Sequence, residues 1–119
     1  MEEILKQMVI EVSTVCKVGA QWVQADTEFP YTTYAYQSST SKNVDEVELT
    51  FDIWDKSKSI KQVEDIANAI REKLDRHKFT TEIGDFFAVA YHGSQSLITE
   101  DNPDTKRIRT IFSVRKYQL

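Results

Sequence analysis

The chain has 119 residues, of which 40% are hydrophobic and 29% are charged, and its formal net charge at pH 7 is −4. This length suits one domain, residues 1–119, with a core that needs no disulfide or metal. The acidic balance argues against a general nucleic-acid or membrane-surface binder. The one cysteine, Cys16, excludes an intrachain disulfide and favours a reducing compartment. An acidic start without a long apolar run predicts neither a signal peptide nor a transmembrane helix.

An amphipathic helix is expected near the start of the chain, from about Glu2 to Lys17. Its apolar residues recur at the i, i+4 and i+7 spacing of one buried face, on which Cys16 is a small core residue. Acidic residues in the first turn favour the positive end of the helix dipole. The β-branched residues in this run leave a strand open as an alternative. Residues 20–30 show no clear period, and we interpret them as a loop anchored by Trp22.

Two strands joined by a polar turn are expected next. Tyr31 to Gln37 is rich in threonine and tyrosine, a composition typical of strands, and Pro30 can begin a strand but cannot interrupt one. Val47 to Trp54 alternates between apolar and polar side chains, which predicts a half-buried strand. The polar run from Ser38 to Asn43 is the turn between them, so the two strands form a hairpin.

The clearest element is a second helix from Ser59 to Leu74. Ser59 and a glutamine three residues later have the spacing of a capping box, and an apolar stripe follows. Two further strands, Phe86 to Leu97 and Lys106 to Tyr117, flank a turn at residues 101–104. The expected order is therefore α-β-β-α-β-β. This order predicts an α+β domain with a mainly antiparallel four-stranded sheet and two helices packed on one face.

Two rows of opposite charge are predicted on the uncovered face of this sheet. They lie on two different strands, with Glu46, Glu48 and Asp52 on one and Arg107, Arg109 and Arg115 on the other. If these strands are neighbours, the charges pair across the sheet, and each pair contributes about 0.2–1 kcal/mol. If they are not neighbours, the two rows could face complementary rows on another subunit.

Residue types that carry catalysis or bind metals are scarce. His77 and His92 lack a second histidine or a cysteine at metal-ligand spacing, and His77 follows the second helix, where it could cap the helix end. A nucleophilic Ser94 would need a base and an oxyanion hole, and the G-x-S-x-G motif is absent. The acidic residues at 100–104 lack the frame of a calcium loop, so a solvated turn is the simpler interpretation. We therefore expect no catalytic residue, no metal and no cofactor.

The ordered set of these segments resembles the phage tail-completion family, the small tail-terminator or head–tail joining proteins of long-tailed phages and prophages. Pro30-Tyr31 with Tyr34 is similar to the proline-aromatic first strand of that family, and Asp52-Ile53-Trp54 is similar to the end of its next strand. The second helix and the final hairpin follow in the same order. One departure is that family members often carry a short extra strand before the proline-aromatic strand, which residues 20–28 do not show.

The resemblance implies a non-enzymatic virion structural protein, made in the bacterial host cytoplasm and located at the tail–head junction. Such proteins cap the tail tube and join it to the head, commonly as a homo-oligomeric ring of six. The implied partners are the tail tube protein and the head-connector protein. DNA passes through the ring without specific binding, and no membrane is involved. Ring contacts are heterologous, so one surface meets a different surface on the neighbour.

We expect the charged rows to form these contacts, together with a polar loop that could order on docking, made of Ser39, Thr40, Ser41 and Lys42. The aromatic residues Tyr31, Tyr34 and Trp54 are expected to serve packing and assembly rather than to line a binding pocket. A small ligand-binding or regulatory α+β domain remains an alternative, and it predicts a concave apolar pocket with converging polar groups. A small hydrolase that uses His92 or Ser94 ranks last, because no partner for either side chain is evident.

Overall fold

The computed structural model describes residues 1–20, 28–38 and 46–118 of the chain. The elements in these ranges are α1 (Glu2–Ser13), β1 (Val18–Ala20), β2 (Tyr31–Ser38), β3 (Glu46–Lys56), α2 (Lys61–Leu74), β4 (Lys78–Thr80), β5 (Phe86–Ile98) and β6 (Thr105–Gln118). Two predictions fall outside the described residues, namely the anchoring role of Trp22 and the docking loop of Ser39, Thr40, Ser41 and Lys42.

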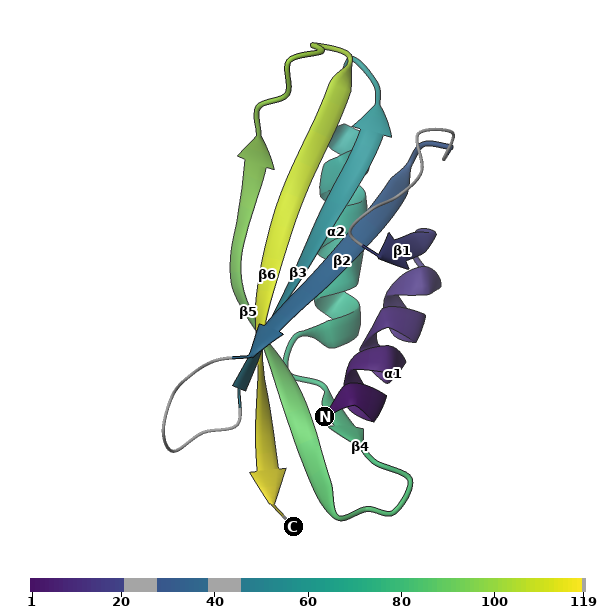
Figure 1. Ribbon diagram of the computed structural model, residues 1–119. Helices are drawn as coiled ribbons and strands as arrows, with labels where there is room; N and C mark the ends of the chain where they lie inside the picture. Colours follow the sequence, from purple (N-terminus) through teal and green to yellow (C-terminus); the bar gives the residue numbers. More distant parts are fainter. Residues whose placement is uncertain (21–27, 39–45, 119) are drawn as a thin grey trace.

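The strands form one six-stranded sheet in the order β1-β2-β3-β6-β5-β4 (Figure 1). β1 and β2 are parallel, and the other neighbouring strands are antiparallel. The prediction of a mainly antiparallel four-stranded sheet in the order α-β-β-α-β-β is therefore wrong, although the α+β class is compatible with the structure. The predicted hairpin of β2 and β3 and the two long strands β5 and β6 are present.

The two missed strands, β1 and β4, are each three residues long and lie at opposite edges of the sheet. Alternation cannot be recognised over three residues, so these strands are set by their neighbours rather than by their own pattern. The Thr32 amide donates to the Lys17 carbonyl at 2.9 Å beside β1. The Gln7 side chain on α1 donates to the Thr80 carbonyl at 2.9 Å in β4. β1 is also a short strand between α1 and the segment that begins at Tyr31. A strand in this place is the feature of the tail-completion family that the sequence of residues 20–28 did not show.

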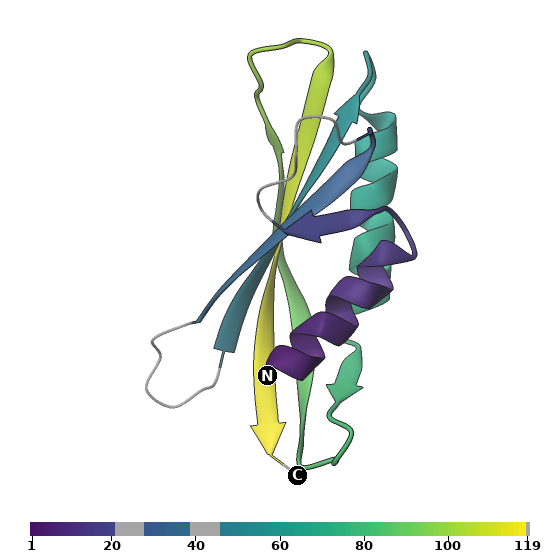
Figure 2. The same cartoon turned by 45° about the vertical axis from the view of Figure 1, so that its right-hand side comes forward.

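Both helices lie against the same face of the sheet (Figure 2). α1 is a helix as predicted but ends at Ser13 rather than at Lys17, and Cys16 beyond it is still only 8% exposed, as expected for a core residue. α2 begins at Lys61, later than predicted, and Ile60, the residue directly before it, makes no capping hydrogen bond with its side chain. The Ser59 hydroxyl accepts a hydrogen bond of 3.1 Å from the Lys61 amide in the first turn. The Ser59 amide, however, donates to the Ser57 hydroxyl at 3.2 Å rather than to Gln62, so the predicted capping box is wrong.

One hydrophobic core lies between the helices and the sheet. β3 contributes every second residue to it, as the alternating pattern predicted. Phe51 of β3 and Phe112 of β6 are fully buried and meet edge to face, with ring centroids 6.1 Å apart. The opposite side of the sheet, which we call the outer face, is not covered by either helix (Figure 2). Its side chains are therefore the first candidates for a functional surface.

Candidate functional site

The outer face carries both predicted rows of charge. β3 and β6 are antiparallel neighbours, and their register places Asp52 opposite Arg109 and Glu46 opposite Arg115. The sequence left open whether the two charged strands are neighbours, and the structure shows that they are. The charges accordingly pair across the sheet within one chain.

Asp52 is the centre of an ion-pair network on this face. Its carboxylate is 14% exposed, and it accepts hydrogen bonds from Arg107 Nη2 at 3.1 Å and from Arg109 Nε at 2.9 Å. Arg107 also donates from Nη1 to Glu100 at 3.1 Å. The hydrogen bonds to Asp52 raise the pKa of Arg109 above its ordinary value. The network thus ties β3 and β6 to the turn that follows β5.

An aromatic cluster adjoins this network where β2 begins. Tyr31 stacks on Trp54 with ring centroids 6.1 Å apart, and Phe29 lies 5.1 Å from the Tyr31 ring. The Arg107 guanidinium is 4.5 Å from the Trp54 ring, a cation–π contact. Burial and then the Glu100 carboxylate raise the pKa of Tyr31. These contacts agree with a packing role for Tyr31 and Trp54.

A second aromatic cluster, which sequence reasoning missed, lies at the other end of the outer face. Phe87 stacks on Tyr117 with centroids 5.2 Å apart, and Lys78 Nζ lies 4.3 Å from the Phe87 ring. The hydroxyls of Tyr91 and Tyr117 are 3.0 Å apart, and this hydrogen bond raises the pKa of Tyr91. The sequence contained a signal for this cluster, because Phe87 and Tyr91 alternate with smaller buried residues along β5.

Only part of the predicted charged set can still reach another molecule. Glu48 is exposed and has no hydrogen-bond or ion-pair partner among the described residues. Arg109 is 39% exposed, and together with Glu48 it lines a shallow hollow of about 200 Å³. Arg115 lies 4.0 Å from Glu46, which also accepts a hydrogen bond from Ser113. Glu48 is therefore the least satisfied charge of the set.

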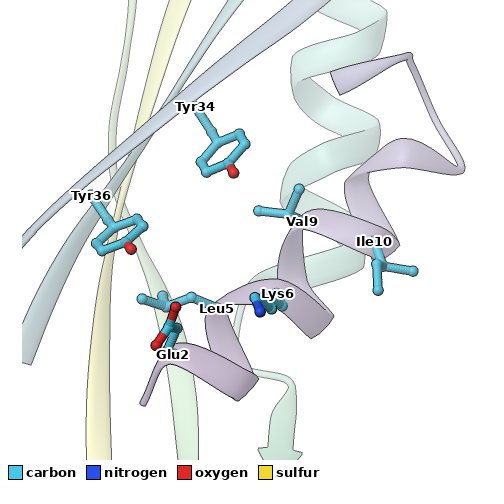
Figure 3. A pocket seen from close by; sticks show the side chains of 7 residues that line it. All are labelled: Glu2, Leu5, Lys6, Val9, Ile10, Tyr34 and Tyr36. Carbon is cyan, nitrogen blue, oxygen red and sulfur yellow. The ribbon is translucent and has the colours of Figure 1, made fainter. Parts of the chain in front are cut away.

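A groove of about 320 Å³ lies on the other face, between α1 and β2 (Figure 3). It is lined by apolar and aromatic side chains with two exposed charges beside them: Leu5, Val9, Ile10, Tyr34 and Tyr36, then Glu2 and Lys6. The expectation that Tyr34 would not line a pocket is wrong. The groove has the apolar walls that a ligand-binding domain predicts, but its charged groups lie on the exposed side of α1.

The two histidines occupy separate parts of the fold. His77 Nε2 lies 2.9 Å from the Glu72 carbonyl oxygen in the last turn of α2, which confirms the predicted capping position. His92 lies on β5 with its ring centroid 5.4 Å from that of Phe112 in the core. A register shift follows His92 and places Ser94 opposite an outer-face residue of β6. His92 and Ser94 therefore point to opposite faces and form no nucleophile–base pair.

The stability of the fold is expected to depend on pH through His92. Burial lowers the pKa of His92, the nearby Arg71 lowers it further, and Asp75 opposes them. Since the folded pKa is below the unfolded one, the unfolded chain binds the proton first as the pH falls. The contribution of His92 is therefore constant above about pH 6.5, and below it the free energy of unfolding decreases. Urea unfolding at about pH 7.5 and about pH 5.5 measures the loss.

The matched variant for this prediction is His92→Gln, which cannot take up a proton. We expect its free energy of unfolding to change less between the two pH values than that of the unchanged protein. An equal loss in both proteins would show that other groups cause the pH dependence.

The described residues contain no group of three or more histidine, cysteine, aspartate or glutamate side chains that could hold a metal ion. Of the acidic turn, Glu100 is paired with Arg107, and the Asp104 amide donates to the Asn102 side chain at 2.9 Å. No helix in the described ranges is both long enough and apolar enough to cross a membrane.

Comparison with known proteins finds a likeness in fold. No protein-family model matches the chain, and no curated protein sequence matches it. Among solved structures, the chain is similar to a chain of the structure described as "Virion of native gene transfer agent (GTA) particle", with a TM-score of 0.74 and 10% sequence identity. The match covers 98% of this chain and 93% of that chain. At this identity the likeness shows the fold alone, and it extends over nearly the whole length of both chains.

Proposed function

We propose that the chain is a non-enzymatic structural protein of a phage-like virion that caps the tail tube and joins it to the head. The observation that carries the proposal is the fold, which is shared over 98% of the chain with a chain of a gene transfer agent virion. The resemblance to tail-completion proteins supports the same class of particle. Since β1 precedes β2, the chain also has the short strand that this resemblance had lacked.

The proposed assembly is a homo-oligomeric ring, of six subunits in the family that the chain resembles. One side of the ring would meet the tail tube protein and the other the head-connector protein, at the tail–head junction. DNA would pass through without specific binding. The net charge of −4 suits this role, because an acidic conduit repels phosphates rather than holding them.

The outer face is our proposed contact surface between subunits. The proposed residues are those of the two charged rows and the polar loop: Glu46, Glu48, Asp52, Arg107, Arg109, Arg115, Ser39, Thr40, Ser41 and Lys42. Since Asp52 and Arg107 satisfy each other within one chain, their part is to fix the shape of the surface. Glu48 is the member best placed to pair with a basic group on a neighbour, because the contacts of a ring are heterologous.

The substitution Glu48→Lys tests this surface. We expect its free energy of unfolding to stay within about 0.5 kcal/mol of the original, because the side chain is exposed. We expect fewer rings in electron micrographs of the concentrated protein and fewer joined heads and tails in a complementation assay. The matched control is Glu72→Lys, which makes the same charge change on an exposed position of α2.

Ring numbers equal to those of the original protein would remove Glu48 from the proposed interface. The function itself has a separate test, which is deletion of the gene from the particle's genome. Normal yields of joined particles after the deletion would contradict the role at the tail–head junction.

A further inference from the structure

The second half of β5 forms an edge of the sheet (Figure 1). β4 pairs with only three residues of β5, and the segment that follows α2 then occupies the edge as far as His92. The Arg76 amide donates to the Ala90 carbonyl at 2.7 Å. The His92 amide donates to the Asp75 carboxylate at 2.9 Å. Beyond His92, no strand of the described chain pairs with this edge.

Two residues in the open part of the edge, residues 93–98, direct their backbone groups outward. Backbone groups of successive residues point to opposite sides of a strand, and His92 directs its amide to the edge. The register shift at Gly93 moves this alternation by one residue. Gln95 and Leu97 therefore direct their N–H and C=O groups to the open edge, and their neighbours direct theirs to β6.

Apart from the bulge at Gly93, this edge lacks the features that keep edge strands apart. Residues 93–98 contain no charged residue and no proline, although 29% of the whole chain is charged. The Leu97 side chain, on the helix side of the sheet, is 54% exposed. The segments that adjoin the edge along the chain, residues 75–92 and 99–104, are all described, so described residues bound the open stretch on both sides.

The helix beside this edge carries a stripe of charge that is complementary to itself. Asn68 of α2 lies at the edge, because its Oδ1 is 3.5 Å from Gln95 Nε2. Arg71 and Asp75 follow on the same side of α2, where they help to line a hollow of about 440 Å³.

Helical spacing extends the stripe in the other direction to Glu64 and Lys61. One turn from Asn68, a glutamate on one side matches an arginine on the other. Two turns from Asn68, a lysine on one side matches an aspartate on the other. The remaining charges of these turns, Asp65 and Glu72, are rotated further towards solvent.

We propose that the open edge of β5 pairs with the same edge of a second copy of this chain, about a two-fold axis. In antiparallel pairing centred on Ser96, Gln95 of each copy exchanges backbone hydrogen bonds with Leu97 of the other. The two Ser96 side chains meet at the axis on the outer face, where their small size leaves room for close approach. The exposed Leu97 side chains then lie against the second copy.

The charges of α2 favour a second copy as the occupant. α2 runs antiparallel to β5, since Asn68 lies near Gln95 and Asp75 bonds to His92. The two-fold axis therefore sets the two α2 helices antiparallel, with the Asn68 residues nearest the axis. Glu64 of each copy then faces Arg71 of the other, and the outer charges of the stripe match in the same way. A strand of an unrelated protein would bring no such match.

The test is disulfide formation in the full chain, after Cys16→Ala has removed its own thiol. Ser96→Cys places two thiols opposite each other at the axis, with Cα atoms about 4.5 Å apart, so mild oxidation is expected to give a covalent dimer on a non-reducing gel. Ser94→Cys is the matched control on the same face, and its two copies lie about 13 Å apart. A mixture of Ser94→Cys and Ile98→Cys is expected to join, because these positions face each other.

The crosslinks also separate this contact from other modes of association. No covalent dimer from Ser96→Cys, or as much from Ser94→Cys, would overturn the proposal. Pairing of β5 with the opposite edge of the sheet in a neighbouring copy would let chains associate in sedimentation without joining Ser96→Cys. That result would likewise overturn the two-fold contact.

The match between the α2 helices has its own test in the Ser96→Cys protein. Arg71→Glu is expected to lower the yield of covalent dimer at least about fivefold, and Glu64→Arg added to it is expected to restore the yield. Because Glu64 and Arg71 lie about 10 Å apart along one helix, recovery requires contact between two chains. A double variant no better than Arg71→Glu would overturn the proposal.

This contact uses the edge of the sheet and not the outer face, so the inference does not rest on the proposed virion function. Glu48→Lys is expected to leave the covalent dimer of Ser96→Cys unchanged. A dimer that persists while rings are lost would support two separate surfaces. Loss of the dimer in Glu48→Lys would assign the crosslink to the outer face and overturn the proposal.

Discussion

Replacing Asp52 by alanine is expected to lower the free energy of unfolding by about 3 kcal/mol. The carboxylate is largely buried and accepts hydrogen bonds from both Arg107 and Arg109. Without it, Arg107 retains only Glu100 as an ionic partner, and its own Nε is already buried without an acceptor. A poorly compensated buried charge costs more than the loss of a surface ion pair. Urea unfolding followed by circular dichroism measures the change.

The control for this prediction is Glu48→Ala on the same strand and the same face. Glu48 is exposed and has no partner in the described part of the chain, so its loss should change the free energy of unfolding by less than about 0.5 kcal/mol. Asp52→Asn should fall between the two, because it keeps the shape but not the charge. If Asp52→Ala were as mild as Glu48→Ala, the network would contribute no more than exposed ion pairs do.

Replacing Phe112 by alanine is expected to lower the free energy of unfolding by about 4 kcal/mol. The ring is fully buried, and it meets Phe51 edge to face and the His92 ring at 5.4 Å. The substitution leaves a cavity at the centre of the sheet and removes both ring contacts. Phe112→Leu keeps most of the volume and should cost roughly 1–2 kcal/mol. A loss below about 1 kcal/mol for Phe112→Ala would mean that the core collapses into the space.

The same substitution bears on the titration of His92. Burial is the largest cause of the lowered pKa of His92, and Phe112 packs against its ring. Water that enters the cavity would solvate the imidazolium and bring its pKa closer to the ordinary value. Phe112→Ala should therefore lose less of its remaining stability between neutral and mildly acidic pH than the original protein does.

The longer elements could be predicted because their patterns extend over many residues. β3 alternates along its whole length, and α2 has a continuous apolar stripe, so periodicity was sufficient for both. The ends were less certain, since α1 ends at Ser13 although apolar residues continue beyond it. β1 and β4 were missed because three residues carry no period and depend on pairing with β2 and β5.

The candidate site was predicted in composition but not in arrangement. Charged residues at alternate positions of two strands identify a solvent-facing row, but only the register of β3 and β6 shows that Asp52 and Arg109 face each other. The groove could not be predicted, because it requires the placement of α1 against β2. From sequence alone, Tyr34 and Tyr36 are typical strand residues.

The position of β6 has a consequence for the order in which the protein can fold. β6 is the last strand along the chain, yet it lies between β3 and β5 in the sheet. β3 and β5 therefore have no common neighbour until β6 has been synthesised, and the sheet remains in two separate parts during translation. A growing chain buries its central core residues only after β6 leaves the ribosome. Incomplete chains consequently lack the folded outer face.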